Sequence, residues 1–175
     1  GNGRGVEWRD MPFESIDVGV SRQLREGSDV ALLVFGALCG EAEQAAEQAE
    51  VIGVSTAIYD MRFAKPLDEK LLLEIGGKFK RIVTLEDGII RGGAGEAVVK
   101  LLSDNGIDTP IVTLGIDDTF VEHGTVAELR HLCGYPSRGA SIDIGEGRLH
   151  GFLGCLLKLG KIFPKLLCAV KLALY

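Results

Sequence analysis

Acidic and basic side chains follow the ends of several apolar runs in the sequence. They are Asp60, Arg62, Glu86, Asp87, Asp117 and Asp118. If these runs are parallel strands, their carboxyl ends share one edge of a sheet, where ligands bind in open α/β folds. One hypothesis is that these groups converge on a polar site, with Arg62 binding an anion and Glu86 acting as an acid or a base. We prefer a structural hypothesis, in which they cap helix N-termini and pair with one another.

A glycine-rich turn, Gly92-Gly93-Ala94-Gly95, precedes a predicted helix, as phosphate-binding turns do. It matches neither the G-x-G-x-x-G pattern nor the P-loop, which needs a Lys followed by Ser or Thr after its last glycine. Close approach between a helix and a strand explains the glycines without a ligand. We therefore favour packing over phosphate binding at this turn.

Histidine and cysteine, the residues that most often act as nucleophiles or metal ligands, are few and scattered. His123 precedes a predicted helix, and no Ser or Cys nucleophile can be placed beside it, so we expect a capping or interface role. The cysteines are Cys39, Cys133, Cys155 and Cys168. They form no C-x-x-C pair, and no His lies at zinc-ligand spacing from them, so we expect no metal site and no disulfide framework. This usage favours a reducing, cytoplasmic setting.

The segments that would position these residues alternate between strand and helix patterns. Apolar runs predict strands at residues 29–35, 54–59, 81–85 and 110–114, and helical patterns cover residues 41–52, a helix opened by Pro66, residues 92–103 and residues 126–132. Alternating apolar residues predict one more strand at 13–20, at an edge. We expect a three-layer α/β/α sandwich around a mostly parallel sheet of about five strands, one of them an antiparallel edge strand.

Charge is unevenly distributed along the chain of 175 residues, which is long enough for one domain. Residues 149–175 contain four lysines and no Asp or Glu, so their +4 leaves −10 on the remainder of a chain whose net charge is −6. Phosphate backbones are bound by clustered Lys and Arg, so an acidic body argues against a nucleic-acid partner.

Three sequence blocks, in this order and spacing, resemble the C-terminal domain of the 1-deoxy-D-xylulose-5-phosphate synthase family. They are YDMRFAKPLD at 59–68, VTLEDG at 83–88 with the glycine-rich turn at 92–95, and LGIDDTFVEHG at 114–124. The resemblance implies a linker from upstream domains at 1–14, a transketolase C-terminal-like domain at 15–139 and an atypical tail at 140–175.

The family condenses pyruvate with glyceraldehyde 3-phosphate and releases CO₂, using thiamine diphosphate and Mg²⁺. Its product feeds isoprenoid, thiamine and pyridoxal phosphate synthesis. Because its cofactor and metal are held by the two preceding domains, the resemblance places no catalytic, cofactor-binding or metal-binding residue on this chain. It implies an architectural role, in which the domain packs on the upstream domains and helps form a homodimer. The candidate interface or rim residues are Asp60, Arg62, Glu86, Asp87 and His123.

Two alternatives remain open from the sequence. The first is the same domain in a 2-oxoacid dehydrogenase β-subunit, where it docks an acyltransferase, although residues 60–68 fit the synthase family better. The second is a stand-alone module that binds a small ligand at the acidic rim.

The tail departs from the family pattern after about Gly139. Lys158, Lys161 and Lys165 fall on one helical face among Leu and Ile, which is typical of a helix lying on an anionic membrane. Charges and Pro164 interrupt the apolar stretch too often for a membrane span. We favour a helix docked on the domain, or a tail from a shifted reading frame or an unusual gene end, over membrane contact.

Overall fold

The strands of the computed structural model, which describes residues 15–125, 128–129 and 133, form one sheet in the order β1-β3-β2-β4-β5. The strands are β1 (Arg22–Arg25), β2 (Val30–Phe35), β3 (Thr56–Asp60), β4 (Arg81–Ile89) and β5 (Ile111–Ile116). All neighbouring pairs are parallel except β1 with β3, which is antiparallel. The predicted mixed sheet with an antiparallel edge is confirmed.

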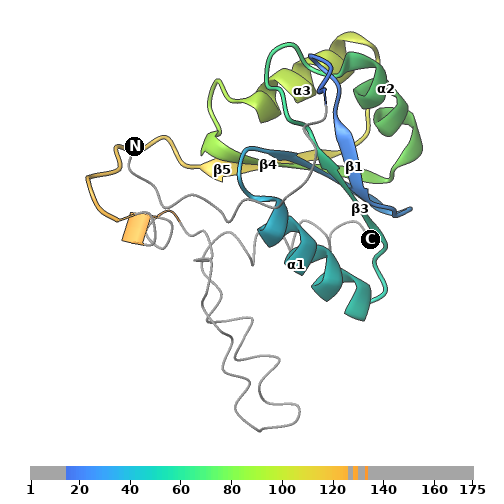
Figure 1. Ribbon diagram of the computed structural model, residues 1–175. Helices are drawn as coiled ribbons and strands as arrows, with labels where there is room; N and C mark the ends of the chain where they lie inside the picture. Colours follow the sequence, from blue (N-terminus) through green and yellow to red (C-terminus); the bar gives the residue numbers. More distant parts are fainter. Residues whose placement is uncertain (1–14, 126–127, 130–132, 134–175) are drawn as a thin grey trace, which may run out of the picture.

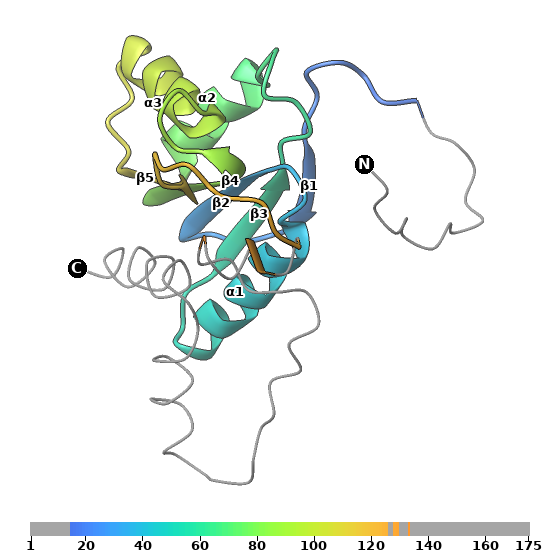
Figure 2. The same cartoon turned by 90° about the vertical axis from the view of Figure 1, so that its left-hand side faces the viewer.

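Helices cover both faces of this sheet. They are α1 (Cys39–Val51), α2 (Glu69–Lys78) and α3 (Ala94–Asp104). Figure 1 shows α1 below the sheet and α2 with α3 above it, and the turned view in Figure 2 shows the same three layers. The predicted α/β/α arrangement is therefore confirmed, and the crossovers between parallel strands run through the helices.

The centre of the sheet is buried on both faces. Alternate residues of β2 belong to two separate apolar clusters, with Leu32 on the α1 side and Leu33 on the side of α2 and α3. A strand of this kind has no polar face, which is why β2 reads as a continuous apolar run. On the α1 side the helix contributes small side chains, including Ala42 and Ala46, so its backbone can lie close to the sheet.

The predicted strand at residues 13–20 is wrong for the part that the structure describes. The N–H of Val20 donates to the carbonyl of Asp17 at 3.3 Å, and Gly19 has a φ of 77°, so the chain turns where the strand was expected. The edge strand is β1, whose sequence RQLR has one apolar residue, Leu24, against the core. Alternation signals a strand only where a second surface covers the apolar face, and here Ile16 and Val18 are exposed.

Smaller differences concern the ends of elements. Helix α2 begins at Glu69 rather than at Pro66, because the carboxylate of Asp68 accepts a hydrogen bond from the N–H of Leu71 at 3.2 Å and caps the helix. Strand β4 continues four residues past the predicted end, to Ile89. Most of the helix predicted at 126–132 lies outside the described residues. Glu128 and Leu129, the two residues of this range that the structure describes, are helical.

Close packing explains the glycine-rich turn before α3. Gly93 has a φ of −79°, which any residue can adopt, but a Cβ there would overlap the carbonyl oxygen of Ile89 and both carboxylate oxygens of Glu86. A Cβ on Gly95 would lie 2.5 Å from the hydroxyl of Thr84 and 3.0 Å from a methyl of Thr113. The missing side chains therefore let α3 begin directly against β4 and β5.

Two glycine substitutions test this packing. We expect Gly93→Ala to lower the free energy of unfolding by about 1–3 kcal/mol, because its methyl group meets fixed backbone. Gly77 in α2 has open space around its Cβ position, so Gly77→Ala should instead stabilise the domain by about 0.5–1 kcal/mol through helix propensity. Urea unfolding followed by circular dichroism measures both. Equal effects of the two variants would contradict this account of the turn.

Candidate functional site

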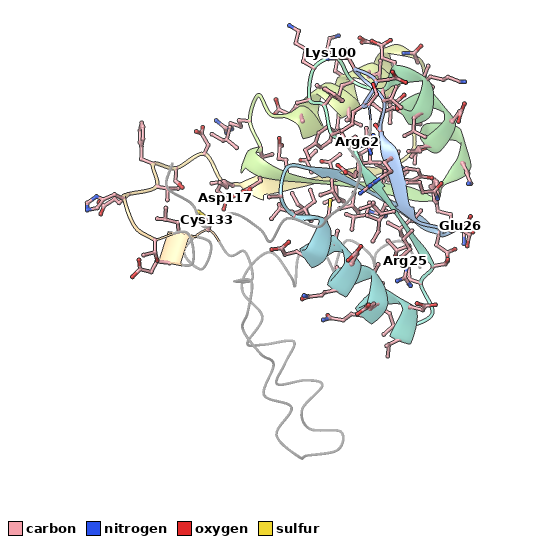
Figure 3. The ribbon with its side chains drawn as sticks, viewed as in Figure 1. Arg25, Glu26, Arg62, Lys100, Asp117 and Cys133 are labelled. Atoms are coloured by element: carbon pink, nitrogen blue, oxygen red, sulfur yellow. The ribbon has the colours of Figure 1, made fainter. Side chains whose placement is uncertain are left out.

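The rim residues predicted from the sequence do lie at the carboxyl edge of the parallel strands. Asp60 ends β3, Glu86 and Asp87 lie late in β4, and Asp117 follows β5. Figure 3 shows Arg62 and Asp117 well apart, since Arg62 follows β3 and Asp117 follows β5. Among the described residues, the rim groups are held in separate local contacts rather than converging on one polar site.

The first of these contacts is between Asp60 and Arg62. The backbone N–H of Arg62 donates to one carboxylate oxygen of Asp60 at 3.2 Å, and the Arg62 Nε lies 3.9 Å from the other. Arg62 has a φ of 56°, which is uncommon outside glycine and places its side chain back beside Asp60. A pair at the surface contributes about 0–1 kcal/mol, so its main effect is to shape the loop after β3.

Glu86 is the most buried of the predicted residues, with 5% of its surface exposed. Its Oε2 accepts a hydrogen bond from the backbone N–H of Ala94 at 2.8 Å, and the N–H of Gly95 also donates to the carboxylate. The carboxylate therefore lies at the N-terminus of α3, where the helix dipole favours negative charge. Burial raises the pKa of Glu86 above its ordinary value, and the hydrogen bonds from Ala94 and Gly95 oppose that shift.

The position of Glu86 argues against a phosphate site at this turn. The N–H groups at a helix N-terminus can bind a phosphate, and those at the start of α3 bind the carboxylate of Glu86 instead. An added Cβ at Gly93 would overlap both oxygens of that carboxylate, so the carboxylate fills the space beside the turn. The diphosphate of a cofactor does not fit this turn.

Asp87 and Asp118 occupy more exposed positions on the rim. Asp87 lies beside the turn after β2, where Gly36 has a φ of 90° and an added Cβ would lie 3.0 Å from the Cβ of Asp87. The carboxylate of Asp118 is 3.4 Å from the guanidinium of Arg91, and both side chains are largely exposed. This contact joins the loop after β5 to the loop before α3.

His123 lies in the loop between β5 and the helical residues near Glu128, and it is exposed. The cap that the sequence suggested for it is formed instead by Thr125. Both the N–H and the hydroxyl of Thr125 donate to the carboxylate of Glu128, and the N–H of Glu128 donates back to the hydroxyl at 3.4 Å. These contacts lower the pKa of Glu128. The T-x-x-E spacing that signals this capping box was present in the sequence.

Metal ligation and membrane insertion find no support in the part of the chain that the structure describes. Within that part, no three His, Cys, Asp or Glu side chains are grouped so that they could hold a metal ion. None of its helices is both long enough and apolar enough to span a bilayer. Cys39 and Cys133 are free thiols, and burial raises the pKa of Cys39. The tail at 140–175 lies outside the described residues.

A cleft that the sequence did not suggest lies at the opposite, amino edge of the sheet. It has a volume of about 470 Å³ and is lined by Gln23, Glu26, Gly27, Ser55 and Lys78. Figure 3 shows Glu26 at the end of the sheet away from Asp117. Its walls come from three separate segments of the chain, so no local motif could have revealed it. The lining is polar and open to solvent, and it contains no buried charged group.

Comparison with known proteins identifies the domain. Residues 19–139 match the family model described as "Transketolase, C-terminal domain". The 1-deoxy-D-xylulose-5-phosphate synthase of Bacteroides fragilis is 48% identical over 150 residues, which are 85% of this chain and 23% of that protein. The same enzyme from Synechococcus elongatus is 35% identical over 138 residues, or 79% of this chain and 22% of its own length. The chain thus spans less than a quarter of these relatives.

A solved structure described as "Split gene transketolase, inactive beta4 tetramer" has the same fold. It is 28% identical with a TM-score of 0.66, and the match covers 94% of this chain and 43% of that one. The resemblance found in the three sequence blocks is confirmed by both kinds of comparison. The chain therefore belongs to the transketolase C-terminal domain family, in the form carried by 1-deoxy-D-xylulose-5-phosphate synthases.

Proposed function

We propose that this chain is the structural and dimerisation domain of a 1-deoxy-D-xylulose-5-phosphate synthase and is not catalytic by itself. The parent enzyme would condense pyruvate with glyceraldehyde 3-phosphate and release CO₂, in the cytoplasm. The observation that carries the proposal is the extent of the match, which covers 85% of this chain but only 23% of the Bacteroides fragilis synthase. The remaining three quarters of such an enzyme can hold the reaction centre.

The chemistry of the cofactor supports assigning catalysis to the rest of the parent enzyme and a structural role to this domain. When bound, thiamine diphosphate supplies the carbanion chemistry, and it needs a buried pocket for its rings and oxygen ligands for Mg²⁺. The described residues do not fit that requirement. The N-terminus of α3 is filled by the carboxylate of Glu86, and the described residues contain no group suited to a metal. We therefore assign the cofactor and Mg²⁺ to the upstream domains of the parent enzyme.

In this proposal the rim residues serve the architecture of the domain. Glu86 caps α3 from within and is not an acid–base group, since its carboxylate is directed at backbone N–H groups and is shielded from solvent. Asp60, Arg62 and Asp87 shape the loops after β3 and β2, and His123 is left exposed for contact with a neighbour. The partners would be the upstream thiamine-binding domains and a second subunit of the same enzyme.

The solved neighbour offers a parallel for a chain without activity. That protein is described as a split-gene transketolase in an inactive β4 tetramer. In that case a transketolase polypeptide assembles without being active. For the present chain we propose a homodimer within the intact enzyme.

A chimera tests the proposal directly. The C-terminal region of the Bacteroides fragilis synthase, to which this chain is 48% identical, would be replaced by residues 1–175. We expect the chimera to be dimeric and to form deoxyxylulose phosphate from pyruvate and glyceraldehyde 3-phosphate. The same synthase truncated before that region is the control and should lose dimerisation. Product formation by the isolated chain, or a folded chimera without activity, would contradict the proposal.

The burial of Glu86 predicts a pH dependence of stability. Because its pKa is raised in the folded state, the folded protein binds this proton more tightly than the unfolded chain does. The resulting contribution to the free energy of unfolding is fully present below the ordinary value of 4.5 and is lost as the pH rises through the raised value. Urea unfolding across this range should show the free energy of unfolding of the wild type falling relative to that of Glu86→Gln. Glu47→Gln, in an exposed position on α1, should keep the wild-type slope.

A further inference from the structure

The loop after β5 extends away from the body of the domain. Residues 117–124 leave the sheet at the end of β5 and reach outward before the chain returns to the helical residues near Glu128, as Figure 1 shows. This loop lies within the region that matches the transketolase C-terminal family, residues 19–139. It is therefore part of the family's domain rather than an addition to it.

An aromatic side chain lies on this loop with no cover from the described residues. Phe120 is fully exposed, and Val121 beside it is 38% exposed. Burying a Phe side chain contributes about 1.5–3 kcal/mol, and Phe120 would gain this stabilisation only when a partner covers it. Aromatic residues are enriched in the buried centres of protein interfaces, where they act as anchors.

The loop that carries Phe120 is fastened at both ends. At its start the carboxylate of Asp118 pairs with Arg91 at 3.4 Å, and the N–H of Thr119 donates to the carbonyl of Asp117 at 2.7 Å. At its end Thr125 and Glu128 form the capping box. These contacts restrict the loop, so ordering Phe120 on binding costs less conformational entropy than it would in a loop without them.

The charges around the anchor define the chemistry of its partner. Asp117, Asp118 and Glu122 lie within three residues of Phe120, and Arg91, which pairs with Asp118, offsets one of these three charges. The chain outside residues 149–175 is also strongly acidic. A second copy of the same loop would bring carboxylates against carboxylates, which is unfavourable. The complementary surface is an apolar pocket with Lys or Arg at its rim.

We propose that Phe120 docks this domain into an apolar, basic-rimmed pocket on the thiamine-binding part of the same synthase. This inference rests on the proposed function, in which that part makes up the roughly three quarters of each relative that the chain does not span. Covalent connection keeps such a partner at high effective concentration, so a single anchor and its charged surroundings are enough to set the docking geometry.

The chimera with the Bacteroides fragilis synthase provides the test, with amide hydrogen exchange of residues 117–124 as the readout. We expect the loop amides to be protected in the wild-type chimera but not in the isolated chain. Phe120→Asp should raise exchange in the chimera by at least about tenfold, which corresponds to about 1.4 kcal/mol. The matched control is Val99→Asp on α3, another exposed apolar position, which should leave the loop protected.

The possible outcomes separate this inference from the proposed function. In the isolated chain, Phe120→Asp should leave the urea midpoint unchanged, because the side chain is already exposed. An active wild-type chimera whose loop stays equally protected in Phe120→Asp would overturn the docking role alone. A dimer of the isolated chain that Phe120→Asp dissociates would also overturn it, in favour of a second copy. A folded but inactive wild-type chimera would reject the proposed function itself.

Discussion

The hydrogen bonds between the Glu86 carboxylate and the start of α3 organise the carboxyl edge of the sheet. Glu86 comes from strand β4, which lies between β2 and β5, and its partners are the backbone N–H groups of Ala94 and Gly95. The contact requires Gly93 and Gly115 to have no side chain, since a Cβ on Gly115 would lie 2.7 Å from the carbonyl of Gly88 and 3.0 Å from the Cγ of Glu86. One buried carboxylate thereby ties β4, α3 and the end of β5 together.

This arrangement has a consequence for function. Open α/β sheets bind ligands beyond the carboxyl ends of their strands, often with a phosphate at a helix N-terminus. Here an internal carboxylate binds the same N–H groups, so the most favourable anion site of the fold is already satisfied by the protein. What the edge presents to other molecules is the set of loops around it. This geometry supports the architectural role proposed above over a role in binding a small anion.

The parts of the fold that could be predicted from the sequence are those whose residues are buried or exposed in a regular pattern along the whole element. Strand β2 is buried on both faces, so its apolar run was unambiguous, whereas the polar strand β1 has only Leu24 against the core and left no pattern. The position of Glu86 at the sheet edge followed from the order of the elements. Its hydrogen bonds to Ala94 and Gly95 depend on how the intervening loop closes, which periodicity does not encode.

The exposed apolar residues of the described chain lie largely outside the sheet. The residues that stabilise the fold are therefore different from those that could contact a partner. The apolar clusters on the two faces of the sheet are closed around β2 and β4, while Phe120 and Val18 lie in connecting segments and contribute nothing to those clusters. Substitutions in these segments can alter a docking surface at little cost to the fold. The proposed anchor at Phe120 is one of these residues. Its loop leaves the sheet beside the contact between Glu86 and α3, and that contact holds the part of the sheet from which the loop extends.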